Sequence, residues 1–160
     1  MRSKRLKYLL QGSIIAALYV ALTVLFSGIS YGVVQVRIAE ALTVLPFFTP
    51  AAIPGLFVGC ALANMIGGYG LLDVVVGSLA TLFAAFMTYR IKNRWLAPLP
   101  SVLLNGVMVG LMLAYVLELP AFVTMGQIAL EQAVACYGLG LPLLLLLNRY
   151  GRRIFPSKDV

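Results

Sequence analysis

The chain has 160 residues, of which 62% are hydrophobic and only 11% are charged, and it contains no histidine. A soluble domain carries about 25% charged residues, so this composition excludes an ordinary cytosolic globule, a disordered chain and a secreted disulfide scaffold. The net charge of +7 comes from basic residues at the edges of long apolar runs, which favours membrane topology over nucleic-acid recognition.

Long segments free of Lys, Arg, Asp and Glu recur along the chain. A helix crosses the hydrocarbon layer in about 20 residues, and the segments lack the period-two alternation of a β-barrel. Glycine and proline clusters divide them, and Pro54 is well placed to start a helix. We predict one all-α membrane domain over residues 1–160. Its six transmembrane helices are expected near residues 9–29, 38–48, 54–66, 71–91, 101–117 and 122–147, with a bend in the last at Pro142.

The basic residues test this count of helices. All Lys and Arg residues except Arg37 fall in three clusters, which are Arg2, Lys4, Arg5 and Lys7; Arg90, Lys92 and Arg94; and Arg149, Arg152, Arg153 and Lys158. The positive-inside rule places all three clusters in the cytoplasm. Six crossings put both termini and the fourth connection there, whereas five or seven would not. The segments around residues 29–40, 64–73 and 117–122 are then expected at the outer face.

Small residues recur at every fourth position on three of the predicted helices. They are Gly55, Gly59, Ala63 and Gly67; Gly106, Gly110 and Ala114; and Gly12 and Ala16, beside Ala17 and Ala21. Such ridges let helix backbones approach closely in lipid. Internal packing is the expectation for the third and fifth helices. The ridge of the first helix could equally dock another membrane protein.

Five ionisable side chains lie outside the basic clusters and the C-terminal tail, namely Arg37, Glu40, Asp73, Glu118 and Glu131. An ionised residue at the membrane centre costs about 2.5–3.5 kcal/mol on insertion scales, so each needs a partner or a function. The predicted topology puts all of them in the outer half or at the outer surface. This indicates one polar pocket open to the outside.

Glu131 is the strongest signal, because it lies inside the sixth predicted helix. Gln127 is four residues earlier and therefore on the same helical face. A buried carboxylate below an amide suits a ligand with adjacent N–H donors, although a protonated glutamate could instead bond a neighbouring helix. Tyr137 is a weaker candidate for ring stacking, and Glu118, in a loop, is expected to be solvated.

The other polar residues have structural readings as well. Arg37 and Glu40 are three apart and could pair with each other. Asp73 could be a helix-start residue favoured by the helix dipole. Asn64 and Asn105 could be hydrogen-bonding links between helices.

The sequence lacks the residues that an ATP-binding loop, a histidine-activated nucleophile or an aspartate-based metal site would require. There is no Gly-x-x-x-x-Gly-Lys-Ser/Thr loop for ATP, no histidine for a nucleophile pair, and no aspartate-based metal motif. Cys60 and Cys136 have no Cys-x-x-Cys spacing and are expected to be packing residues. We therefore expect a protein that is not an enzyme and has no cofactor or metal of its own.

Four stretches resemble the QueT family of proposed queuosine-precursor uptake proteins, which are substrate-binding S-components of energy-coupling factor (ECF) transporters. They are residues 36–56 (VRIAEALTVLPFFTPAAIPGL), 70–82 (GLLDVVVGSLATL), 96–100 (LAPLP) and 131–137 (EQAVACY). The family pattern has a glycine where this chain has Leu130. The likeness extends over nearly the whole chain.

The resemblance implies a six-helix S-component in a prokaryotic cell membrane, with a site near the outer surface roofed by the loops after the first, third and fifth helices. Such proteins have no ATPase. They dock onto a T-component carrying two ATP-binding subunits through an Ala-x-x-x-Ala ridge on the first helix, which Ala17 and Ala21 match, and transport is thought to involve toppling of the S-component.

The ligand implied by the resemblance is a 7-deazaguanine, in its 7-cyano or 7-aminomethyl form, or queuine. Its ring N–H and exocyclic amine suit one carboxylate, for which Glu131 is the first choice and Glu40 the second. An amide side chain would serve its carbonyl group, and Asp73 or Glu40 could meet an aminomethyl cation. The candidate substrate-binding residues are Glu131, Glu40, Asn64, Asn105, Asp73, Arg37, Gln127 and Tyr137.

Other functions stay open at this point. A stand-alone secondary carrier or small multidrug exporter would use the buried carboxylate for proton exchange, although the two halves show no convincing repeat. An intramembrane enzyme would form product without a partner, and a structural scaffold would tolerate the loss of Glu131.

Overall fold

The computed structural model describes residues 2–30, 36–68 and 70–150, and within these ranges every regular element is a helix. This confirms the predicted all-α class for the described part of the chain. In chain order the elements are α1 (Arg2–Leu25), α2 (Ser27–Ser30), η1 (Ile38–Phe47), α3 (Ala52–Gly67), α4 (Leu71–Arg90), α5 (Leu99–Leu104), η2 (Asn105–Val109), α6 (Gly110–Val116), α7 (Ala121–Ala135), η3 (Cys136–Gly140) and α8 (Leu141–Tyr150).

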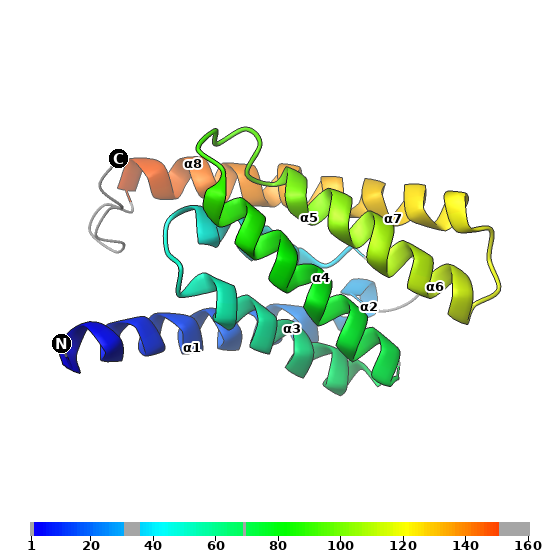
Figure 1. Cartoon of the computed structure of the whole chain (residues 1–160), viewed down its shortest axis with the longest axis horizontal. Helices are drawn as coiled ribbons and strands as arrows, with labels where there is room; N and C mark the ends of the chain where they lie inside the picture. Colours follow the sequence, from blue (N-terminus) through cyan, green and yellow to red (C-terminus); the bar gives the residue numbers. More distant parts are fainter. Residues whose placement is uncertain (1, 31–35, 69, 151–160) are drawn as a thin grey trace.

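The helices run up and down along one long axis (Figure 1). The start of α1 and the end of α8 lie at the same end of the bundle, and the connection between α4 and α5 lies toward that end too. The turns after α3 and after α6 lie at the opposite end. The last basic cluster falls partly outside the described residues, since Arg152, Arg153 and Lys158 follow residue 150.

Four helical stretches are long and apolar enough to cross a membrane, namely Lys4–Leu25, Leu71–Arg90, Leu99–Val116 and Ala121–Arg149. The other two helices are shorter, with 16 residues in α3 and 10 in η1. At their respective rises they extend about 24 Å and about 20 Å, against about 30 Å of hydrocarbon. The outer surface is apolar, and Phe122 is 89% exposed. Such a surface suits lipid rather than water.

The short helix η1 lies in the centre of the bundle and is a 3-10 helix, where the sequence predicted only a short helix. All of its residues from Ala39 to Pro46 are buried, and it contacts α1, α3, α4, α7, η3 and α8. A 3-10 helix rises about 2.0 Å per residue instead of 1.5 Å, so ten residues reach further through the bundle. Pro46 has no amide to donate to a preceding turn.

The predicted packing ridges are confirmed for α3 and for the α5–α6 stretch. A methyl group added at Gly55 would lie 2.6 Å from the carbonyl oxygen of Gly12, so α1 and α3 touch through their backbones. A methyl group at Gly106 would lie 2.9 Å from Cβ of Ala129 on α7. These glycines permit close approach in lipid, where the hydrophobic effect does not hold helices together.

Three differences from the predicted boundaries bear on the fold. The first helix begins earlier, at Arg2, and is interrupted at Phe26 rather than continuing to residue 29. α3 begins at Ala52, so Pro54 is its third residue, where a missing amide still costs no helical hydrogen bond. The last stretch leaves α-helical geometry at η3, a π-helical turn that ends two residues before Pro142. Proline cannot donate to the turn before it, which explains a departure at this place.

Candidate functional site

The candidate site begins where three elements bring their charged and amide side chains together. Arg37 immediately precedes η1, Asn64 lies near the end of α3, and Asp73 lies in the first turn of α4. All three side chains are buried. Asp73 thus lies at the start of a helix, as predicted, and its side chain also lies near Arg37.

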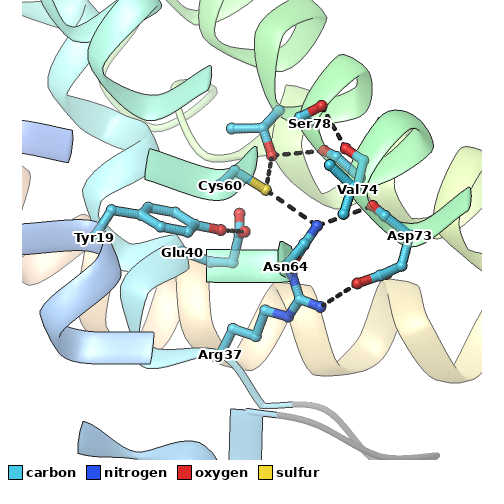
Figure 2. Close-up of polar contacts among 10 residues, drawn as sticks. Tyr19, Arg37, Glu40, Cys60, Asn64, Asp73, Val74 and Ser78 are labelled. Carbon is cyan, nitrogen blue, oxygen red and sulfur yellow. Dashed lines mark hydrogen bonds and ion pairs between the residues drawn. The ribbon is translucent and has the colours of Figure 1, made fainter. Parts of the chain in front are cut away.

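Arg37 links the other two side chains (Figure 2). Its Nη1 donates a hydrogen bond of 2.8 Å to Oδ1 of Asn64, and its Nη2 lies 3.7 Å from Oδ2 of Asp73. Asn64 in turn donates to the backbone carbonyl of Asp73 at 2.9 Å. The contacts tie the start of η1 to the ends of α3 and α4 and pair two buried charges, which offsets part of the cost of their desolvation.

Glu40 continues this polar region toward α1. It lies in the first turn of η1, is 1% exposed, and its Oε1 accepts a hydrogen bond from the hydroxyl of Tyr19. Its other oxygen, Oε2, has no hydrogen-bond partner within residues 2–30, 36–68 and 70–150. Glu40 therefore keeps unused accepting capacity in the interior.

A small cavity of about 10 Å³ lies beside these residues. Its polar wall consists of Arg37, Glu40, Cys60, Thr81, Asn105 and Gln132. The volume is close to the minimum that holds one water molecule. The cavity wall thus takes residues from η1, α3, α4, η2 and α7. The volume of the cavity is much smaller than that of a base with two fused rings.

Asn105 reaches the cavity from the first residue of the π-helical turn η2. It is 3% exposed, and its Nδ2 donates no hydrogen bond within the described residues. π-helical turns occur frequently at functional sites. The amide nitrogen of Asn105 therefore does not form the predicted hydrogen bond to another helix within the described residues. Asn64 does form such a bond, from α3 to α4.

Glu131 and Gln127 lie together on α7, as their spacing predicted. Nε2 of Gln127 donates to Oε1 of Glu131 at 3.0 Å, and Glu131 is 7% exposed. The cavity wall includes their neighbours Ile128 and Gln132 instead. Tyr137 is half-buried in η3. Of the eight candidate binding residues, the structure brings Arg37, Glu40 and Asn105 to the cavity, and Asn64 and Asp73 contact Arg37.

Sequence reasoning missed three residues of this region. Tyr19, Gln132 and Thr81 are not among the residues that the sequence pattern singles out. A tyrosine in an apolar helix needs a partner for its hydroxyl, and this signal points to Tyr19. Cys60 is a buried core residue, as expected, and also accepts a hydrogen bond from Thr81 at 3.4 Å. Glu118 is exposed in its loop.

The opposite side of α1 faces outward. Ala17 and Ala21 are exposed and line an apolar groove of about 830 Å³ between α1 and α3. Gly12 and Ala16 also line this groove, at its base, where they contact α3. One helix thus carries an internal packing face and an outward face of small residues.

Comparison with known proteins identifies the family of this chain. The sequence profile described as "QueT transporter" matches residues 9–149. A protein of Lactococcus lactis subsp. cremoris (strain MG1363), described as "Queuosine precursor transporter QueT", is 28% identical over 91% of this chain and 93% of its own length. No solved structure matches the chain. The match over most of the chain shows that it belongs to the QueT transporter family and is a transport protein rather than an enzyme.

Proposed function

We propose that this chain takes up a queuosine precursor, a 7-deazaguanine, as the S-component of an ECF importer in the plasma membrane of a prokaryote. The observation that carries the proposal is the buried polar cavity, where Glu40 and Asn105 keep unused hydrogen-bonding capacity inside an apolar helical bundle. A polar binding site in a membrane protein is costly and therefore indicates function. The Lactococcus relative, which is named as a queuosine precursor transporter, supports this class of substrate.

The proposed topology has six crossings with both termini in the cytoplasm. The basic residues Lys4, Arg5 and Lys7 at the start of α1 and Arg149 at the end of α8 support it, because these two helix ends lie at the same end of the bundle in Figure 1. The two short crossings are then η1, which is buried in the bundle, and α3, which keeps one exposed face. Arg37, Asn64 and Asp73 then lie toward the outer face, from which a substrate would enter.

The cavity must widen before a base can enter it. About 10 Å³ is far less than the room that a fused two-ring base needs, so binding requires helices or side chains to move apart. The π-helical turn η3 places irregular backbone next to η1, and η2 places it next to α4 and α7. Such turns allow local shifts. The structure is therefore described best as a closed arrangement of the site.

The energy for transport is proposed to come from partner subunits. The ECF T-component and its two ATP-binding subunits would supply ATP hydrolysis, since this sequence lacks a phosphate-binding loop. The exposed groove at Ala17 and Ala21 is the proposed docking surface. Small residues there would let a partner helix approach the α1 backbone.

Uptake of labelled 7-deazaguanine compounds by cells tests the proposal. Cells that produce this chain together with an ECF module should accumulate the label, and cells that lack the module should not. Uptake without any ECF module would instead favour a stand-alone secondary carrier.

The docking surface has its own test. Leucine at Ala17 and Ala21 should fill the groove and lower uptake at least about tenfold, by blocking backbone approach, while the purified variant still binds the base. Leucine at Ala61, a half-buried position on α3 that is not on the groove wall, is the control. Unchanged uptake by the Ala17→Leu, Ala21→Leu variant would remove this groove from the proposal.

A further inference from the structure

We infer that Glu40 and Asn105 together recognise the edge of the base that carries an exocyclic amine, a ring N–H and a carbonyl group. Glu40 accepts from the amine and the N–H, and Asn105 donates to the carbonyl oxygen. This inference rests on the proposed function and deepens it, because it assigns the ligand's hydrogen-bonding edge to particular atoms. It replaces Glu131, the first choice from the sequence, by Glu40.

Unmet hydrogen-bonding capacity is the first reason. Oε2 of Glu40 and Nδ2 of Asn105 are buried, and neither has a hydrogen-bond partner in the part of the chain that the structure describes. Both residues line the same cavity. Buried polar atoms are nearly always paired in native proteins, so two unpaired ones at a single cavity indicate a ligand.

The second reason is that both side chains are held in place. The hydroxyl of Tyr19 donates to Oε1 of Glu40 (Figure 2), which fixes the carboxylate, and its Oε2 has no hydrogen-bond partner among the described residues. Asn105 begins η2, whose next residue, Gly106, packs directly against Ala129. In the closed arrangement both groups are already oriented, and a widening of the cavity that keeps these contacts leaves them little conformational freedom to lose on binding.

The third reason is chemical complementarity. The edge of a 7-deazaguanine presents donor, donor and acceptor in order, and the paired carboxylate and amide present acceptor, acceptor and donor. Oε1 of Glu40 retains a lone pair beside the bond from Tyr19, so the carboxylate can accept two ligand hydrogens. In an adenine-type base the ring nitrogen at this edge is a hydrogen-bond acceptor, whereas the carboxylate of Glu40 requires a donor there. Glu131, by contrast, already accepts from Gln127 and is not on the wall of this cavity as the described residues form it.

Binding to the purified protein, measured by calorimetry in detergent, tests the inference. Glu40→Gln should weaken 7-deazaguanine binding by about 10- to 100-fold, as expected for hydrogen bonds to a charged group. Asn105→Leu should weaken it by about 3- to 10-fold, as expected for a neutral hydrogen bond. Glu118→Gln makes the same chemical change at an exposed loop residue and should bind as the unaltered chain does.

A second ligand separates recognition from damage to the fold. 7-Deazahypoxanthine lacks the exocyclic amine, so the loss caused by Glu40→Gln should be about tenfold smaller with it than with 7-deazaguanine. General unfolding of the variant would weaken the binding of both ligands equally. Asn105→Leu is measured independently, so the donor half of the inference stays testable if Glu40→Gln does not fold.

Two results would overturn the inference. An amine-dependent loss in Glu131→Gln but not in Glu40→Gln would return the recognition role to Glu131 and leave the proposed function intact. No binding of any 7-deazaguanine by the unaltered chain would overturn the proposed function and this assignment together.

Discussion

Arg37 has the most demanding environment of the buried residues, because it is a cation that contacts both Asn64 and Asp73. Breaking a buried ion pair by removing one partner costs about 3–5 kcal/mol, since the other charge stays unpaired. Arg37→Met should therefore lower the thermal unfolding temperature markedly in detergent. Arg37→Lys should be intermediate, because an ammonium group cannot reproduce the forked contact.

An exposed cation provides the control for this prediction. Lys92 lies exposed in the connection after α4, and Lys92→Met removes the same charge without breaking a buried pair. Equal unfolding temperatures for Arg37→Met and Lys92→Met would show that the Arg37 contacts add nothing to stability.

Tyr19 provides a second prediction at the residue scale. Its hydroxyl donates to Glu40 in the interior, and hydrogen bonds to charged groups are worth about 1.5–3 kcal/mol. Tyr19→Phe should destabilise the protein by about that amount, whereas Tyr115→Phe, at a residue that is 82% exposed, should not. Thermal unfolding in the same detergent measures both, and a Tyr19→Phe variant as stable as Tyr115→Phe would contradict the buried hydrogen bond.

At the scale of elements, α1 and α3 depend on glycine for their contact. Alanine at Gly55 would place its methyl group 2.6 Å from the carbonyl oxygen of Gly12, which forces the helices apart. We expect destabilisation of about 1–3 kcal/mol from this overpacking. Among the described residues, a methyl group added at Gly126, on α7, would meet no atom within 4 Å apart from its own chain neighbours and the nearby backbone of its helix. Gly126→Ala should be neutral or stabilise by up to about 1 kcal/mol, since alanine favours a helix.

Thermal unfolding again compares these two variants, and their opposite signs are the informative result. If Gly55→Ala were as stable as Gly126→Ala, the close contact between α1 and α3 would not exist in the membrane protein. If both stabilised the protein equally, helix propensity alone would account for the two substitutions.

The helices were predictable from this sequence because glycine and proline residues mark the turns between them clearly. Pro50 and the glycines of residues 67–70 separate helices where the sequence predicted turns, and the segments between them are apolar. The 3-10 geometry of η1 and the π-helical turns were not predictable, because they arise from packing against neighbouring helices rather than from local propensity.

The site was harder to predict than the helices. Glu131 and Glu40 both look like buried carboxylates in the sequence, and which of them faces the cavity depends on the rotation of α7 and η1 about their axes. The spacing of Gln127 and Glu131 correctly predicted their proximity on one helix. The contacts of Arg37 with Asn64 and Asp73 join residues 27 and 36 positions away along the chain, and no local pattern shows such pairing.

At the scale of the whole molecule, the proposed topology predicts which loops face the cell exterior. A cysteine at Glu118, in the turn before α7, should react in intact cells with a maleimide that cannot cross membranes. A cysteine at Lys92, in the connection after α4, should react only after the cells are permeabilised, because the proposed topology places its basic cluster in the cytoplasm. Cys60 and Cys136 are buried and are replaced by alanine in both variants. The reverse labelling pattern would contradict the orientation.

The central claim is that the buried polar cavity belongs to a binding site for a 7-deazaguanine. Mass spectrometry of the small molecule that purifies with the protein tests it most directly. The account predicts a 7-deazaguanine, present with the unaltered chain and lost from the Glu40→Gln variant. Recovery of an unrelated molecule that stays bound in that variant would contradict it.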